Sequence, residues 1–277
     1  MRLWKETPAM LETPTEPQTP NDPMAVVTSR ADEEPILHFY EAEHKVTDAS
    51  VIIFPGGGYM CRAGYEGCGY ARFFNSIGMN AFVLDYRANP YRFPVPLLDA
   101  RRAFRYVRYH AKEFGVDPNR LAVMGSSAGG HLAALLSTYE EKIDFEGIDS
   151  IDEESYLPNF QILCYPVIVC GKEGHEGSYI ALTGTQDRSV WQSYAPDRLV
   201  HAHTPSAFIW HTSDDGAVNV TNSYAYASAL RAHGIKHEMH VFPCGPHGLG
   251  LAENSPYVAR WKGMLTDHLR LIGYLPE

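Results

Sequence analysis

The sequence predicts an α/β fold, with a mostly parallel, twisted sheet flanked by helices and a small cap insertion. Three observations predict this fold. Short apolar runs alternate with longer runs of helical periodicity along the chain, which is typical of βαβ units. Residues 125–129, Gly-Ser-Ser-Ala-Gly, join an apolar run to a helical run, and this order suits a sharp strand–turn–helix connection. Loops rich in glycine or aspartate follow several other apolar runs.

Seven short runs are predicted to be strands. They are rich in apolar, β-branched and aromatic residues and are bounded by turn-forming residues such as Gly, Pro, Asn and Asp. In chain order they are residues 36–40, 50–54, 81–84, 121–124, 161–165, 207–211 and 237–242.

Five longer runs are predicted to be helices, at residues 65–77, 96–114, 130–137, 223–232 and 256–271. The second of them has apolar residues at helical spacing and is followed by Gly115, a residue type that favours helix termination. It also carries arginines at positions 101, 102, 105 and 108. We expect these arginines to form a solvated face of the helix.

The chain length fits one domain around one core. A protein of 277 residues, 45% of them hydrophobic, can bury a sizeable core. We expect the α/β domain over residues 25–277, after an extended N-terminal arm over residues 1–24 that is rich in Thr, Pro and Glu. Residues 171–204 fit neither pattern well. They are predicted to form a cap-like insertion, because loops of this length are often functional lids.

Composition argues against several functions. The formal net charge of −10 disfavours nucleic-acid binding, because phosphates would be repelled. No stretch reaches the roughly 18 apolar residues that a membrane span needs, and the first residues do not resemble a signal peptide. Five cysteines without a Cys-x-x-Cys pair suit a reducing compartment. We therefore expect a cytoplasmic protein without nucleic-acid or membrane partners, and the sequence leaves a homo-oligomer open.

The histidine pairs do not predict a metal site. His237 and His240 are three residues apart in a predicted strand, so their side chains point to opposite faces. His201 and His203 lack a third clustered ligand. We expect neither a metal nor a cofactor.

Ser127 is the candidate nucleophile. It is the central residue of the pentapeptide 125–129, which follows a predicted strand and precedes a predicted helix. A serine on such a turn is held out in a strained, left-handed-like backbone conformation, and the small residues two before and two after it let strand and helix approach closely.

A second glycine-rich loop, residues 55–59 (Pro-Gly-Gly-Gly-Tyr), follows the predicted strand 50–54. Consecutive glycines leave backbone N–H groups free to point at a negative oxygen, and together with the N–H of Ala128 they can stabilise the oxyanion of a tetrahedral intermediate. A phosphate-binding loop is the alternative. It is disfavoured because neither the Gly-x-Gly-x-x-Gly nor the Gly-x4-Gly-Lys-Ser/Thr pattern occurs here.

Two further loops supply a candidate acid and a candidate base. Asp214 and Asp215 follow the predicted strand 207–211, and His247 lies in a Gly-rich loop after the last predicted strand. The spacing to Val218 favours Asp215 as the carboxylate that orients the imidazole, with Asp214 as the alternative. A cysteine nucleophile at Cys244 is disfavoured because it lacks the strand–turn–helix setting. The chain order Ser, Asp, His is the one expected of an α/β-hydrolase.

These motifs resemble the α/β-hydrolase esterase/lipase family. They are most similar to its small bacterial carbohydrate-esterase-like members, the acetylxylan-esterase-like or sugar-hydrolase-like proteins. The resemblance covers roughly residue 25 to the C-terminus and is carried by residues 55–59, 84–87, 125–133, 215–218 and 245–248. Two positions depart from the family pattern: Pro55 stands where many lipase-like relatives have His, and Asn219 stands where Pro is frequent.

The resemblance implies a serine esterase that hydrolyses short-chain acyl esters, foremost acetyl esters, on sugars or oligosaccharides. The site residues that it implies are Ser127 as nucleophile, His247 as base, Asp215 as its orienting acid, and Gly57, Gly58 and Ala128 as oxyanion donors. A small serine peptidase related to prolyl oligopeptidases and a non-catalytic hydrolase-fold binding protein are the alternatives.

Two aromatic residues are candidates for substrate binding. Tyr59 is expected to line the acyl or leaving-group pocket, because its loop must face the nucleophile. Trp191 lies in the predicted cap with Tyr179 and Tyr194. These rings either present flat faces to a sugar or pack the cap onto the body.

Overall fold

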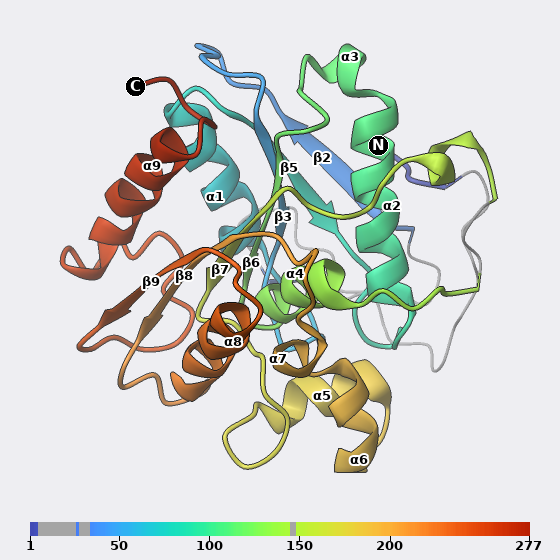
Figure 1. Cartoon of the computed structure of the whole chain (residues 1–277), viewed down its shortest axis with the longest axis vertical. Coiled ribbons are helices and arrows are strands. Elements are labelled where there is room, and N and C mark those ends of the chain that lie inside the picture. The colour runs from blue at the N-terminus through green and yellow to red at the C-terminus, as the bar shows by residue number, and fades with distance from the viewer. Residues whose placement is uncertain (5–25, 28–33, 145–147) are drawn as a thin grey trace.

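A seven-stranded sheet forms the centre of the molecule (Figure 1). The computed structural model describes residues 1–4, 26–27, 34–144 and 148–277. The order of strands across the sheet is β2-β5-β3-β6-β7-β8-β9. Their bounds are β2 Ile36–Tyr40, β3 Ser50–Phe54, β5 Asn80–Asp85, β6 Leu121–Ser126, β7 Phe160–Cys164, β8 Ala207–Thr212 and β9 His237–Phe242.

All strand pairs in this sheet are parallel except one. β2 pairs with β5 in the antiparallel direction, and every other neighbouring pair is parallel. The predicted mostly parallel sheet and its seven strands are therefore confirmed, with ends that differ by one or two residues. Because the strands from β3 to β9 run in the same direction, the loops that follow them meet at one edge of the sheet.

Helices cover both faces of the sheet (Figure 1). Side chains alternate between the faces along each strand, and in β3 this places Ile52 in one core cluster and Val51 in the other. The first cluster includes residues of α2 (Val95–Tyr109), α4 (Ser127–Thr138) and α8 (Thr221–Ala232). The second includes residues of α1 (Gly64–Ser76) and α9 (Trp261–Leu271).

The predicted helix 96–114 is interrupted. α2 ends at Tyr109, His110 leaves helical geometry, and a short helix α3 (Ala111–Phe114) follows. Gly115 ends α3 in the left-handed conformation, as expected for a glycine after a helix. The last predicted helix also starts later than expected, since a 3-10 turn at Val258–Arg260 precedes α9.

The expectation of a solvated arginine face on α2 is wrong. All four arginines are buried and hold the segment that follows α4, together with part of the N-terminus, against the helix. Arg101 donates to the Tyr139 carbonyl and Arg102 binds the carboxylates of Asp149 and Asp152. Arg105 donates to the Glu154 carbonyl, and Arg108 donates to the carbonyls of Pro118, Ser155 and Leu157.

The predicted cap, residues 171–204, contains more regular structure than its sequence indicates. It consists of α5 (Glu176–Thr183), α6 (Arg188–Trp191), a 3-10 turn (Gln192–Tyr194) and α7 (Pro196–Leu199). α5 and α6 lie together at the lower end of the molecule in Figure 1, below α4 and α7. Such short helices are not predicted from hydrophobic periodicity, because they have too few turns to show a repeating pattern.

The described part of the predicted N-terminal arm, residues 1–4, contacts the body. Leu3 and Trp4 are buried. The guanidinium of Arg102 donates to the Leu3 carbonyl and lies over the Trp4 ring. Residues 5–24 of the arm lie outside the described residues. A two-residue strand, β1 (Val26–Val27), pairs with β4 (Arg62–Ala63).

Among the helices of the described part of the chain, none is long and apolar enough to cross a membrane.

Candidate active site

The structure brings Ser127, Asp215 and His247 together at the edge of the sheet where the parallel strands end. Ser127 is the first residue of α4 directly after β6, Asp215 follows β8, and His247 follows β9. The His247 Nε2 lies 2.8 Å from the Ser127 Oγ. The His247 Nδ1 lies 2.7 Å from the Asp215 Oδ2. An imidazole therefore connects a hydroxyl to a carboxylate, the geometry that activates a serine nucleophile.

The backbone at Ser127 has the strained conformation that the pentapeptide predicts. Its φ is 53°, a left-handed value that costs a residue with a side chain about 1–3 kcal/mol. Gly125 and Gly129 allow this tight turn. A Cβ on Gly129 would collide with the carbonyl oxygens of Phe54 and Pro55, and a Cβ on Gly125 would collide with the backbone of Gly129. The turn thus has no room for side chains at either glycine.

Asp215 is buried and held as a carboxylate. Its Oδ1 accepts hydrogen bonds from the N–H groups of Ala217 and Val218, both at 2.9 Å. Burial acts to raise the pKa of the Asp215 carboxyl, but hydrogen bonds from His211, His247 and the Val218 N–H outweigh burial and hold the pKa below its usual value. The carboxylate is therefore ionised at neutral pH and can stabilise an imidazolium at His247.

His211 is a second histidine beside Asp215, and no sequence motif predicts its position there. It lies at the end of β8, fully buried, with its Nε2 2.9 Å from the Val218 carbonyl and 3.4 Å from the Asp215 Oδ2. Both of these partners are acceptors, so Nε2 carries the proton and Nδ1 accepts from the Ser223 hydroxyl at 2.8 Å. The sequence signal was its place at the carboxyl end of a strand, next to the aspartate loop.

The structure gives Asp214 a hydrogen-bond partner other than His247 and leaves Cys244 at the surface. The Asp214 Oδ1 accepts from the Gly245 N–H at 2.7 Å, so this carboxylate anchors the loop that carries the histidine. Cys244 is exposed in the same loop. Of the two aspartates, the geometry favours Asp215 as the partner of His247.

The glycine loop, residues 55–59, lies next to Ser127. Gly57 and Gly58 have φ values of 130° and 66°, and a Cβ on Gly57 would collide with the backbone of Cys61. Among the described residues, no acceptor binds the N–H of either glycine. Ala128 is the second residue of α4, where N–H groups have no acceptor within the helix. These three N–H groups are therefore available to an oxyanion.

Neither aromatic candidate for substrate binding can face a ligand in this structure. Tyr59 and Trp191 are each 1% exposed. The Tyr59 hydroxyl lies 2.7 Å from the Nδ1 of His131, and the Trp191 ring stacks on Tyr179 with centroids 5.6 Å apart. The His131 ring in turn meets the edge of Tyr179 at 5.2 Å. A continuous aromatic stack therefore runs from the glycine loop through α4 into the cap, and the packing alternative fits Trp191.

The cap reaches the site through the start of α5. His175 precedes this helix, and its Nδ1 lies 2.8 Å from the Ser178 Oγ. The Ser178 Oγ would lie 3.9 Å from a Cβ built on Gly58. Burial, and next the charge of the nearby His247, lower the pKa of His175. His175 and Ser178 therefore border the site, although the sequence pattern of the cap did not select them.

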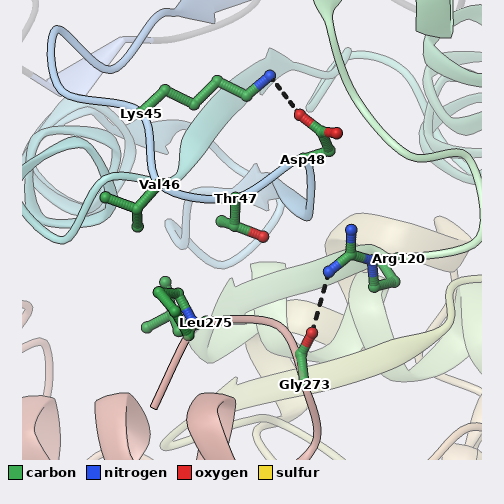
Figure 2. A pocket seen from close by; sticks show the side chains of 8 residues that line it. Lys45, Val46, Thr47, Asp48, Arg120, Gly273 and Leu275 are labelled. Atoms are coloured by element: carbon green, nitrogen blue, oxygen red, sulfur yellow. Dashed lines mark hydrogen bonds and ion pairs between the residues drawn. The ribbon is translucent and has the colours of Figure 1, made fainter.

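Two cavities of the described chain differ in their position relative to the triad. Figure 2 shows one of about 570 Å³, where Lys45 binds Asp48 and Arg120 donates to the Gly273 carbonyl. Asp48 lies two residues before β3 and Arg120 one residue before β6, so this cavity lies at the edge remote from the triad. The other cavity, of about 700 Å³, has His247 in its wall. Its remaining lining includes Tyr65, Phe73, Arg72, Asn254 and Lys262.

A parallel sheet with a nucleophile turn after a central strand, and an acid and a histidine after later strands, defines an α/β-hydrolase. The particular family follows from a comparison of sequences. A family model described as BD-FAE matches residues 37–230, more than half of the chain. The chain belongs to this family of α/β-hydrolase esterases, and the resemblance seen in the sequence motifs is confirmed.

Two curated relatives are similar over most of this chain. Endo-1,4-beta-xylanase B of Butyrivibrio fibrisolvens is 36% identical over 234 residues, which make up 83% of this chain and 36% of that protein. Acetylxylan esterase of Xylanibacter ruminicola is 34% identical over 208 residues, which make up 73% of this chain and 41% of that protein. The chain thus spans about two fifths of the length of these relatives.

A solved structure is similar over nearly the whole chain. It is the crystal structure of an acetyl ester-xyloside bifunctional hydrolase from Caldicellulosiruptor lactoaceticus, which is 39% identical and superposes with a TM-score of 0.85. The match covers 99% of this chain and 96% of that chain.

Proposed function

We propose that this protein is a serine esterase that removes short acyl groups, foremost acetyl, from the hydroxyls of sugars or oligosaccharides. The hydrogen-bonded series Ser127, His247, Asp215 carries the proposal. The sugar as substrate class is supported by relatives whose names refer to acetylxylan and to an acetyl ester-xyloside. Acetylated xylo-oligosaccharides are therefore the first substrates to test.

In the first half of the reaction the Ser127 Oγ attacks the ester carbonyl carbon. His247 accepts the serine proton at Nε2 as the bond to carbon forms, and Asp215 stabilises the resulting imidazolium at Nδ1. The carbonyl oxygen becomes an oxyanion that accepts from the N–H groups of Gly57, Gly58 and Ala128. The C–O bond to the sugar then breaks, and the imidazolium returns its proton to the departing sugar oxygen.

In the second half water hydrolyses the acyl-enzyme. His247 removes a proton from the water, the hydroxide attacks the acyl carbon, and the same N–H groups stabilise the second oxyanion. Breaking the bond to Ser127 releases the acid and restores the serine proton. Asp215 remains a carboxylate throughout, in line with its lowered pKa.

The cavity that has His247, though not Ser127, in its wall is the place that we propose for the leaving sugar. The proton returned by His247 goes to the leaving oxygen, so the leaving group must lie on the side of the imidazole. A volume of about 700 Å³ accommodates more than one sugar ring. Tyr65 and Phe73 supply aromatic surface, and Arg72 and Lys262 supply hydrogen-bond donors for hydroxyl groups.

The first experiment compares wild type with Ser127→Ala. We expect the variant to fold with an unchanged melting temperature and to lose about 10⁴-fold or more of its turnover of p-nitrophenyl acetate. The substitution removes only the hydroxyl group. Circular dichroism and thermal unfolding serve as the folding control. Wild-type turnover by a folded Ser127→Ala variant would end the serine assignment.

The substrate class is tested separately on the wild-type protein. Mass spectrometry of acetylated xylo-, manno- and cello-oligosaccharides records each loss of an acetyl group, and a prolyl amide is assayed beside them. We expect deacetylation of sugars without cleavage of the amide. Amide cleavage without sugar deacetylation would favour the peptidase alternative instead.

A further inference from the structure

A buried carboxylate that the proposed mechanism does not use lies directly behind the glycine loop. Glu66 is in the first turn of α1 and is 2% exposed. Its Oε2 accepts from the Gly56 N–H at 2.8 Å. A Cβ on Gly56 would collide with this oxygen and would lie 3.1 Å from the Ser127 Cβ. The Gly56 peptide is therefore held between Glu66 and the nucleophile, one residue before the first free N–H of the loop.

The second oxygen of Glu66 binds a tyrosine that reaches the histidine loop, residues 243–250. The Tyr165 hydroxyl donates to the Glu66 Oε1 at 2.7 Å and accepts from the Gly250 N–H at 2.9 Å. The Tyr165 ring also meets His247 edge-on, with centroids 5.1 Å apart. One buried carboxylate thus connects the glycine loop to the loop that carries the base.

Tyr165 has the backbone signature of a constrained position. It directly follows β7, it is buried, and its φ is 37°. A tyrosine at positive φ is strained, and such strain persists where the surroundings fix the residue. Its N–H donates to the Trp210 carbonyl at 2.7 Å, and its hydroxyl lies 3.2 Å from that of Tyr70.

We propose that Glu66 and Tyr165 are positioning residues that hold the glycine loop and the histidine loop in register across Ser127. Glu66 orients the Gly56 peptide, so that the N–H groups of Gly57 and Gly58 face the oxyanion. Tyr165 holds the ring and the loop of His247 at the distance that Ser127 requires. This inference rests on the proposed esterase function, because it concerns the same three catalytic groups.

The expected effect is confined to the transition state. Removing one oxyanion donor outright costs about 10²–10³ in turnover, and misorienting the donors should cost part of that. We expect Glu66→Ala to lose about 100-fold in kcat and Glu66→Gln about 10-fold, because the amide keeps an oxygen that can accept from Gly56. Tyr165→Phe should lose about 10-fold. KM for p-nitrophenyl acetate should stay within about twofold in all three variants, because the glycine loop binds the oxyanion of the transition state more strongly than the carbonyl of the substrate.

A matched control distinguishes the proposed positioning role from a purely structural one. Tyr226 is also a fully buried tyrosine, and its hydroxyl donates to the Gln161 Oε1 at 2.8 Å. Gln161 lies at the start of β7, remote from the triad. Tyr226→Phe and Tyr165→Phe each remove one buried phenol hydroxyl. We expect similar losses of melting temperature in the two variants but a loss of kcat in Tyr165→Phe alone.

The decisive measurement is kcat per titrated active site, together with the affinity for a trifluoromethyl ketone that forms a tetrahedral adduct with the serine. The ketone affinity should fall in parallel with kcat/KM in the Glu66 and Tyr165 variants. If Glu66→Ala does not fold, the kcat values of Glu66→Gln and Tyr165→Phe test the positioning role. Wild-type kcat in these folded variants, or an equal loss in Tyr226→Phe, overturns the inference. An active Ser127→Ala variant would instead remove the proposed function itself.

Discussion

At the scale of single residues, two adjacent carboxylates have different tasks. Asp215 is buried and binds the imidazole of His247, whereas Asp214 binds the Gly245 N–H and so anchors the histidine loop. The sequence spacing favoured Asp215 but left Asp214 open, because both follow the same strand. Only the direction of each side chain separates them, and this direction depends on the loop conformation.

We therefore expect opposite results from two conservative substitutions. Asp215→Asn should lower kcat by about 10⁴-fold, because an amide donates to Nδ1 and stabilises the wrong tautomer of the imidazole. Asp214→Asn should keep kcat within about threefold, because the amide oxygen still accepts from the Gly245 N–H. Steady-state kinetics with p-nitrophenyl acetate measures both. A strong loss in Asp214→Asn with a mild one in Asp215→Asn would reverse the assignment.

At the scale of elements, the arginines of α2 show where sequence patterns mislead. Four arginines at helical spacing predict a solvated face, yet all four bind groups of distant segments. Arg102 alone connects α2 to residues 3, 149 and 152. Apart from Pro118, which lies ten positions from Arg108, these partners lie 38 to 99 positions away in the chain, so no local pattern could predict them. The strands, in contrast, follow local alternation and were predicted almost to the residue.

Removal of Arg102 should therefore destabilise the fold. The side chain is 3% exposed and pairs with Asp152, which is 1% exposed, and breaking a buried pair costs about 3–5 kcal/mol. As a matched control, Arg270 pairs with Asp267 at the surface, where an ion pair contributes less than about 1 kcal/mol. Urea unfolding of Arg102→Ala and Arg270→Ala compares the two sites. Equal free energies of unfolding for both variants would contradict this account.

The structure of the cap could be predicted from the sequence far less well than that of the strands. Its position between two strands could be predicted, but its short helices and the burial of Trp191 could not. The helices are too short to show a periodic pattern, and a single aromatic residue has none. The same reason explains why His175, His211 and Glu66 were missed. His175 contacts Ser178, His211 contacts Val218 and Ser223, and Glu66 contacts Gly56 and Tyr165, and no sequence motif marks these contacts. The turn at Ser127, by contrast, was predictable because its geometry requires a local glycine pattern.

At the scale of the whole molecule, the stability of the fold depends on a neutral histidine. His131 is buried, and its Nε2 donates to the Tyr194 carbonyl while its Nδ1 accepts from Tyr59, so it joins α4, the cap and the glycine loop. Burial, opposed only by the Tyr194 carbonyl, lowers the pKa of His131 to about 4. The unfolded chain has an ordinary value near 6.5.

This difference predicts a loss of stability in acid. Between pH 6.5 and pH 4 the unfolded chain binds a proton at position 131 that the folded protein excludes, so the contribution is complete above pH 6.5 and is lost as the pH falls. We expect wild type to lose roughly 2 kcal/mol more unfolding free energy between pH 7 and pH 5 than His131→Gln. Urea titrations at both pH values measure this difference. Parallel losses in the two proteins would show that His131 is protonated in the folded state.

The stack of rings from Tyr59 through His131 and Tyr179 to Trp191 has a consequence for substrate entry. His131–Tyr179 is the pair of this series that joins the cap to the body, and the ring of Tyr194 in the cap adds pairs with Phe93 and Tyr139. Aromatic pairs contribute about 0.5–1.5 kcal/mol each beyond their buried area, so moving the cap aside would break these three at once. The active-site opening that a substrate meets is then the one present in the resting protein, without movement of the cap. We expect selectivity to be settled at first encounter by the shape of that opening, and turnover to respond little to solvent viscosity.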